Sequence, residues 1–170
     1  RDIQGGIAAA YITSYGLYGA ITEASDAISD MAGSFTAFRY DLDGAGNSFT
    51  TTATTSKDNG TTFFSTALTL TLPKLSKEDG AELKLLAYGR PQIVVSDRNG
   101  NAWCLGKVNG NSLTSATMQS GDARADMAGY VLEFGSEEIA PPDLMNGATV
   151  ANPFAGMSSA TVTITAGTNS

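Results

Sequence analysis

Histidine is absent from this sequence of 170 residues. The absence removes Ser-His-Asp and Cys-His catalysis, histidine-ligated zinc or iron, and acid–base chemistry by imidazole. The lack of histidine does not exclude catalysis by carboxylate, lysine or tyrosine side chains, but the sequence suggests no set of such groups that would meet at one site. We therefore expect no enzyme, no cofactor and no bound metal.

Cysteine is nearly absent as well. Cys104 stands alone, so an intrachain disulfide framework is excluded. Without a histidine to activate its thiol, Cys104 is expected to be an ordinary strand residue. The sequence also contains no apolar run of membrane-spanning length, so we expect no membrane partner.

Charge is scarce and mostly negative. Only 16% of the residues are charged, and 17 acidic against 10 basic residues give a net charge of −7. Such a chain has too little positive charge to hold nucleic acid by counterion release. An acidic surface can still face DNA, because it lets the phosphates slide past. The large neutral polar remainder suits packing into an assembly.

Short threonine-rich alternating runs, separated by glycine or asparagine, predict a mainly β protein. The predicted fold is an antiparallel β-sandwich or barrel with one central α-helix at about 76–88. A long projecting hairpin is expected at about 47–72, followed much later by an extended C-terminal arm. The domain prediction is a β body over 1–140 and an arm with a terminal strand over 141–170.

The central helix and the hairpin after it carry the strongest local signals. Ser76 followed by Asp79 resembles a capping box, and Gly89 suits a helix C-terminus. Asn99-Gly100 is typical of a type I′ turn between two alternating strands. The core residues expected in this region are Leu83, Leu86, Val95, Trp103 and Leu105.

The segment Leu17–Met31 remains open between a short helix and a loop with a short strand, because apolar residues at helical spacing alternate there with turn-like Ser-Asp pairs.

Two segments are candidates for contacts between subunits. The first is the tip of the long hairpin, whose outer half is poor in apolar residues and should project from the core. The second is the strand-like end of the chain, which needs an edge to pair with, its own or a neighbour's. The candidate contact residues are Asp58, Asn59, Gly60, Thr61, Thr161, Val162, Thr163 and Ile164.

Two loops carry oxygen ligands at calcium-loop spacing. DLDGAGN (Asp41, Asp43, Asn47) lacks the ligand at position 5 and the glutamate at position 12, and DRNGN (residues 97–101) lacks glycine at position 6. Both are therefore interpreted as turns.

Three acidic residues and five aromatic residues suggest other sites. Glu137 and Glu138, with Glu133, could be imagined as paired carboxylates, but adjacent strand residues point to opposite faces. An exposed platform of aromatic rings could bind sugars, although packing explains the same residues equally well. Its members would be Tyr11, Tyr15, Tyr18, Tyr88 and Trp103.

The run LTLTLPKLSKEDGAELKLLAYGRPQIVVSDRNGNAWCLGKVNG, followed by ADMAGYVLEFGSEE, resembles virion structural proteins of tailed bacteriophages, particularly phages of Bacteroidetes-type hosts. The resemblance covers about residues 2–140, and the arm after Pro141 departs from it. The order of elements and the acidity are similar to those of tail-tube (major tail) subunits.

A tail-tube subunit would form a hexameric ring with a continuous inner β-barrel, and the rings would stack. DNA would pass through without tight binding, other tail or connector proteins would be partners, and the virion would assemble in the host cytoplasm. The alternatives are another virion component (head decoration, head–tail connector or adaptor) or a secreted carbohydrate-binding β-sandwich.

Overall fold

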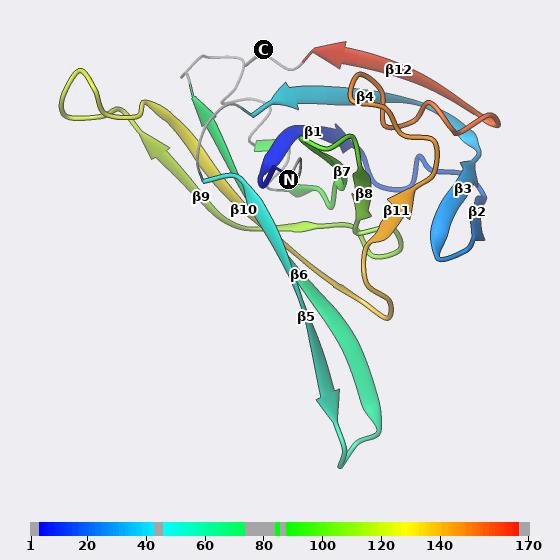
Figure 1. Ribbon diagram of the computed structural model, residues 1–170. Helices are drawn as coiled ribbons and strands as arrows, with labels where there is room; N and C mark the ends of the chain where they lie inside the picture. The colour runs from blue at the N-terminus through cyan, green and yellow to red at the C-terminus, as the bar shows by residue number, and fades with distance from the viewer. Residues whose placement is uncertain (1–3, 43–45, 74–83, 86–87, 167–170) are drawn as a thin grey trace.

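The computed structural model describes residues 4–42, 46–73, 84–85 and 88–166. Twelve strands arranged in two sheets make up its elements (Figure 1). The expectation of a mainly β protein is therefore met, and the two sheets pack face to face around a shared core.

The larger sheet has eight strands in the order β12-β4-β1-β7-β8-β11-β3-β2. Their bounds are β1 (Ile7–Thr13), β2 (Ile21–Ala24), β3 (Ala27–Met31), β4 (Gly33–Asp41), β7 (Gln92–Asp97), β8 (Ala102–Leu105), β11 (Asp143–Met145) and β12 (Ala160–Ala166). Two pairs, β12 with β4 and β11 with β3, are parallel. The sheet is therefore mixed, and the prediction of a purely antiparallel fold is wrong.

The smaller sheet has four strands in the order β5-β6-β10-β9, all antiparallel to their neighbours. They are β5 (Ser48–Ser56), β6 (Thr61–Pro73), β9 (Ser112–Gln119) and β10 (Gly129–Glu138). Alternate side chains of β6 and β10 point into the body, as the alternating sequence predicts.

The predicted central helix at about 76–88 is wrong as a description of the fold. The elements of the described residues are strands only, and of that range only Lys84, Leu85 and Tyr88 are described. Leu85 and Tyr88, which were not among the expected core residues, are 75% and 92% exposed. Leu83 and Leu86 lie outside the described residues. Among the described residues, the first core is formed by the packing of the two sheets against each other.

Two hydrophobic clusters lie on opposite faces of the larger sheet. The first fills the space between the sheets; it includes Val95, Leu105 and Phe134, with Trp103 packed against it. The second includes Tyr11 and is closed by Phe154 and Met157, which come from the segment before β12. One sheet therefore supports two cores.

A β-bulge in β1 determines which of the two cores Ile7 joins. Its register with β7 shifts between Ile7 and Ala9. Ile7 consequently joins the first cluster while Ala9 joins the second, although strict alternation would place both on the same face.

The segment Leu17–Met31 forms the β2–β3 hairpin, so its helical interpretation is wrong. Its two-residue loop consists of Ser25 and Asp26, with φ of 54° and 59°. Positive φ at both positions is the mark of a type I′ turn. At the predicted type I′ turn only Gly100 has positive φ (87°), and residues 98–101 form a four-residue loop.

The long hairpin of β5 and β6 projects from the body, as predicted, and extends downward in Figure 1. The predicted extended arm, in contrast, returns to the body. Its last strand, β12, pairs with β4 of the same chain from Ala160 to Ala166. Asp30 holds the start of this strand, accepting hydrogen bonds from Ser159 N at 3.0 Å and Ser159 Oγ at 2.5 Å.

Candidate assembly surfaces

Each sheet ends in two edge strands, and within the described part of the chain three of the four edges lack the usual protection. Proteins usually block open edges with charge, proline or shortness. β2 follows this rule, being four residues long and carrying Glu23. β5, β9 and β12 are nine, eight and seven residues long and contain neither a charged residue nor proline. These three strands can accept further strands.

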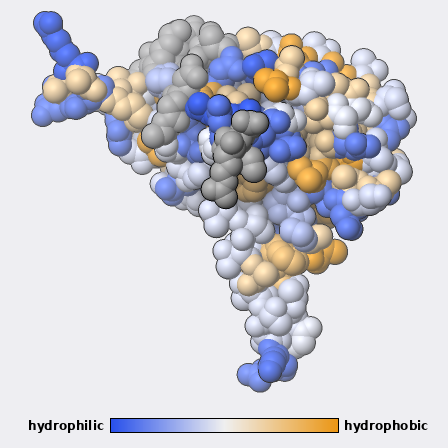
Figure 2. All heavy atoms as spheres, in the orientation of Figure 1, coloured by the Kyte–Doolittle hydropathy of each residue, from blue (hydrophilic) through white to orange (hydrophobic). Residues whose placement is uncertain are grey.

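The β5–β6 hairpin is the most prominent projection. Phe63 is 36% exposed and Phe64 is half-buried. Figure 2 shows hydrophobic residues on the upper part of this hairpin, neutral residues below them and a hydrophilic tip. A two-stranded hairpin in water is only marginally stable alone. Its apolar residues therefore fit a role in which another surface covers them.

The outer face of the smaller sheet is acidic. Glu133, Glu137 and Glu138 are the only charged residues in its four strands. Glu133 and Glu137 are exposed and lie on the face opposite to Leu132 and Phe134, which are buried in the first core. Glu138 turns the other way, and its Oε1 accepts hydrogen bonds from Val108 N (3.0 Å) and Asn109 N (2.8 Å).

The two predicted sets of contact residues lie far apart. Asp58–Thr61 are exposed at the tip of the hairpin, and Thr161–Ile164 lie in β12 at the opposite end of the view in Figure 1. In β12, Thr161 and Thr163 are exposed, while Val162 and Ile164 pack against the second core. No residue pairing between the two sets occurs within one described chain, and their role between subunits remains a prediction.

The loop at 97–101 is a turn held by its own carboxylate. Asp97 Oδ1 accepts hydrogen bonds from Asn99 N at 2.9 Å and Asn101 N at 2.8 Å. Burial raises the pKa of Asp97, but the hydrogen bonds from Asn101 and Asn99 outweigh it, and the net pKa is lowered. The oxygens that a cation would need are thus occupied by donors.

The loop around Asp41 also serves the fold where it is described. Asn47 is buried, and its Oδ1 accepts a hydrogen bond from Thr71 N at 2.7 Å. Asp43 lies outside the described residues. Among the residues that are described, no group of three or more histidine, cysteine, aspartate or glutamate side chains is arranged to hold a metal ion.

The five aromatic residues considered as a sugar platform do not share one surface. Tyr11 is fully buried, and Tyr18 packs on Phe35 with ring centroids 5.0 Å apart. Trp103 packs on Phe49 in the first core, at 5.5 Å.

Cys104 is 1% exposed, and burial raises the pKa of its thiol to about 12. The thiol is therefore protonated at neutral pH, and only a small fraction of it is the reactive thiolate.

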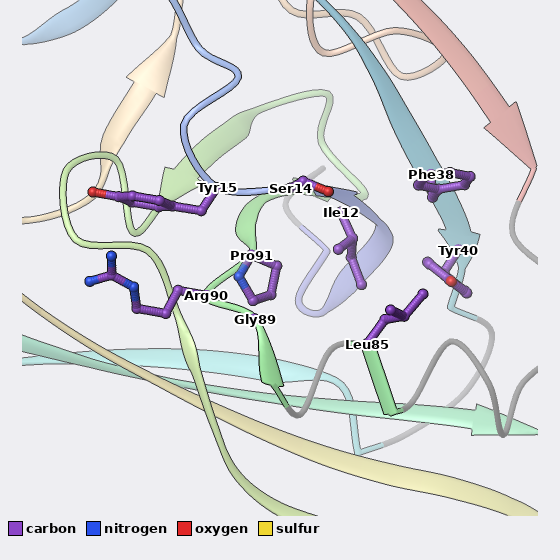
Figure 3. A pocket seen from close by; sticks show the side chains of 9 residues that line it. All are labelled: Ile12, Ser14, Tyr15, Phe38, Tyr40, Leu85, Gly89, Arg90 and Pro91. Carbon is purple, nitrogen blue, oxygen red and sulfur yellow. The ribbon is translucent and has the colours of Figure 1, made fainter.

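Sequence reasoning missed an apolar hollow of about 390 Å³ (Figure 3). Ile12, Phe38, Leu85 and Pro91 line it, and the Arg90 guanidinium stands 4.4 Å from the centre of the Tyr15 ring at its rim. Because these residues come from separate parts of the sequence, no local sequence pattern indicates the hollow.

Sequence reasoning also missed a lysine that joins three elements. Lys107 follows β8, and its Nζ contacts Glu23 of β2 and Asp143 of β11, the latter at 2.5 Å to Oδ2. Burial lowers the pKa of Lys107, but the carboxylates of Asp143 and Glu23 outweigh it, and the net pKa is raised. A cavity of about 320 Å³ adjoins all three side chains.

No family model and no curated protein matches the sequence. Among solved structures, a chain from "Virion of native gene transfer agent (GTA) particle" is similar, with 11% identity and a TM-score of 0.40. The match covers 63% of this chain and 88% of that chain. A TM-score of this size assigns neither fold nor function, so function must be argued from the surfaces described above.

In the described part of the chain, no helix has the length and apolar character needed to cross a membrane.

Proposed function

We propose that this chain is a structural protein of a virion, and more specifically a tail-tube subunit that forms stacked rings around a DNA-conducting lumen. The observation that carries the proposal is the smaller sheet. Its two edge strands, β5 and β9, are long, uncharged and free of proline, and its outward face carries only acidic charge.

The strand directions of this sheet suit ring closure. Its four strands alternate in direction, so β5 and β9 run opposite to each other. When copies are related by rotation about an axis, β9 of one copy meets β5 of the next in antiparallel orientation. Such head-to-tail contacts close a continuous barrel and leave none of these edges open.

In that ring the face with Glu133 and Glu137 lines the lumen, because the opposite face is buried in the first core. A lumen whose described strands carry carboxylates and no lysine or arginine repels phosphate, and DNA can move through it without sticking. The function of the subunit is passive and needs no catalytic group.

The β5–β6 hairpin and β12 supply the remaining contacts. The hairpin extends beyond the body and carries the partly exposed Phe63, which a neighbouring subunit or ring would cover. The outer edge of β12 is open and uncharged, so it can add a strand from a neighbour while its inner edge stays on β4.

Electron microscopy of the purified chain at high concentration tests the proposal. We expect rings or tubes for the wild type. Ala53→Lys in β5 and Ala116→Lys in β9 should abolish them, because a charge on an edge opposes strand addition. Val150→Lys, at a loop position that is 61% exposed, is the matched control and should still assemble.

Wild-type protein that remains strictly monomeric, or rings that survive both edge substitutions, would contradict the proposal. The number of copies in an isolated particle separates a tube subunit, with many copies, from a head–tail connector or adaptor, with about a dozen. A head decoration protein would be found on the head and not along the tail.

A further inference from the structure

Lys107, Asp143 and Glu23 form an enclosed amine–carboxylate group. The Lys107 and Asp143 side chains are only 17% and 16% exposed, and Nζ lies 2.5 Å from Asp143 Oδ2. Glu23 contacts the same Nζ and is 51% exposed. The three residues come from β2, β11 and the turn after β8, so folding alone brings them together.

This arrangement contains the parts of an amide-forming reaction. A lysine amine is a nucleophile when it loses its proton, and a carboxyl carbon held against it is the matching electrophile. Contact within a folded protein replaces a bimolecular encounter and raises the effective concentration of the two groups by orders of magnitude. A second carboxylate on the same nitrogen can transfer protons.

The other titratable groups of this region do not compete for the amine. Glu138 is engaged with the backbone amides of Val108 and Asn109. Cys104, beside Asp143 in the β8–β11 pair, is buried and holds its proton.

We propose that Lys107 and Asp143 become joined by an intramolecular amide bond, with Glu23 as the group that moves protons. The inference is independent of the proposed function, since it concerns the folded chain alone.

The reaction balances without any co-reactant. The two carboxylates favour the ammonium form of Lys107, so the reaction starts from the minor state in which this ammonium has passed one proton to the Asp143 carboxylate. That state places a neutral amine beside a neutral carboxylic acid. Nζ then bonds to Asp143 Cγ, Glu23 takes a proton from the nitrogen and delivers it to the departing hydroxyl, and the C–O bond breaks. One N–C bond and one water molecule are formed, and Glu23 returns to its starting state.

Exposure assigns the roles of the two carboxylates. Asp143 is the enclosed one, so water has little access to its carboxyl carbon. Glu23 is the open one, which suits exchange of protons with solvent. The cavity of about 320 Å³ beside all three residues offers the released water a way out.

The bond would link the end of β8 to the first residue of β11. It would fasten the C-terminal segment, which closes the second core through Phe154 and Met157, to the body of the domain. The pairing of β11 and β12, the packing of Phe154 and Met157, and the hydrogen bonds from Ser159 to Asp30 would then be supplemented by a covalent link.

Intact-mass measurement of the denatured full chain tests the proposal directly. We expect a mass lower than the sequence requires by one water molecule, and full mass in Lys107→Arg, which keeps the charge but cannot form this amide. Digestion after glutamates places Lys107 in 83–133 and Asp143 in 139–170. These two peptides should be recovered joined. Glu23→Gln should fold and accumulate the unjoined form.

Full mass in the wild type would overturn the proposal and leave an ordinary ion pair. A loss of water that persists in Lys107→Arg would overturn it as well, because the dehydration would then lie elsewhere. Fragmentation that places the amide on Glu23 would overturn the assignment of Asp143 as the electrophile.

Discussion

Replacing Lys107 by arginine distinguishes a covalent bond from an ion pair, because the two make different contributions to the free energy of unfolding. The link from Lys107 to Asp143 closes a loop of 36 residues. By the chain-entropy relation for cross-links, a loop of that length contributes about 4 kcal/mol to the free energy of unfolding. An ion pair with solvent access contributes about 1 kcal/mol or less, and arginine retains part of it. We therefore expect Lys107→Arg to lower the free energy of unfolding by about 4 kcal/mol.

Urea unfolding at equilibrium, followed by tryptophan fluorescence of Trp103, measures this loss. The dependence of the unfolding free energy on urea should also steepen, because the unfolded variant is no longer held compact by a link. In a chain of this size the midpoint temperature should fall by roughly 8–16 °C. Asp143→Ala should cost a similar amount, and the double variant little more than either single variant. A loss below about 1 kcal/mol with an unchanged urea dependence would refute the reasoning.

Three further predictions concern the surfaces and the turn. Phe63→Ser should keep the unfolding free energy of the monomer within about 1 kcal/mol of the wild-type value, because the side chain is already partly exposed. The same substitution should abolish rings in electron micrographs. Rings of normal abundance would contradict this prediction. Glu133→Lys with Glu137→Lys should make assembled particles retain duplex DNA in sedimentation, with retention that falls as salt is added; no retention at low salt would count against an acidic lumen. Asp97→Ala should cost about 1–2 kcal/mol at neutral pH through two lost backbone hydrogen bonds. Because the folded pKa of Asp97 is depressed, its contribution is present above the ordinary value of 3.8 and is lost as pH falls through the lower folded value; urea midpoints measured down this range should show the loss in the wild type and not in the variant.

The elements that could be predicted from sequence are those whose signal is local. The alternation of Leu68, Leu70 and Leu72 indicated the buried face of β6, and these residues are buried. The turn signal at 58–60 separated β5 from β6, and the structure has a four-residue loop there. In such hairpins the pattern and the turn lie within one stretch of chain, so few alternatives compete.

The elements that escaped prediction depend on partners distant in sequence. The parallel pairing of β12 with β4 joins residues more than 120 positions apart. Because no tight turn connects the two strands, no local motif in the sequence indicates this pairing. Ser25-Asp26 was recognised as turn-like, but the segment stayed open between helix and strand, because neither residue type indicates a type I′ turn as strongly as glycine does. The helical spacing of Leu83 and Leu86 was a short pattern, and short apolar patterns fit several structures.

The same distinction between local and distant signals applies to the assembly surfaces and the lysine site. The hairpin tip was visible because a threonine-rich run that is poor in apolar residues shows in sequence. The acidic face of β10 needed the knowledge that Glu133 and Glu137 face outward together while Glu138 turns to Val108. Lys107 is 36 positions from Asp143 and 84 positions from Glu23 in the sequence, and no spacing rule connects the three residues.

The sequence distance between β12 and its partner β4 sets when the larger sheet can be completed. Strand β12 and the residues Phe154 and Met157 close the second core, and Asp30 bonds to Ser159 across 129 positions. A ribosome must therefore synthesise residues 160–166 before the larger sheet has its strand β12. Contacts so distant in sequence also make folding slow. A nascent chain cannot present the β12 edge before residues 160–166 have been synthesised, so a subunit can join its neighbours through this edge only after that point.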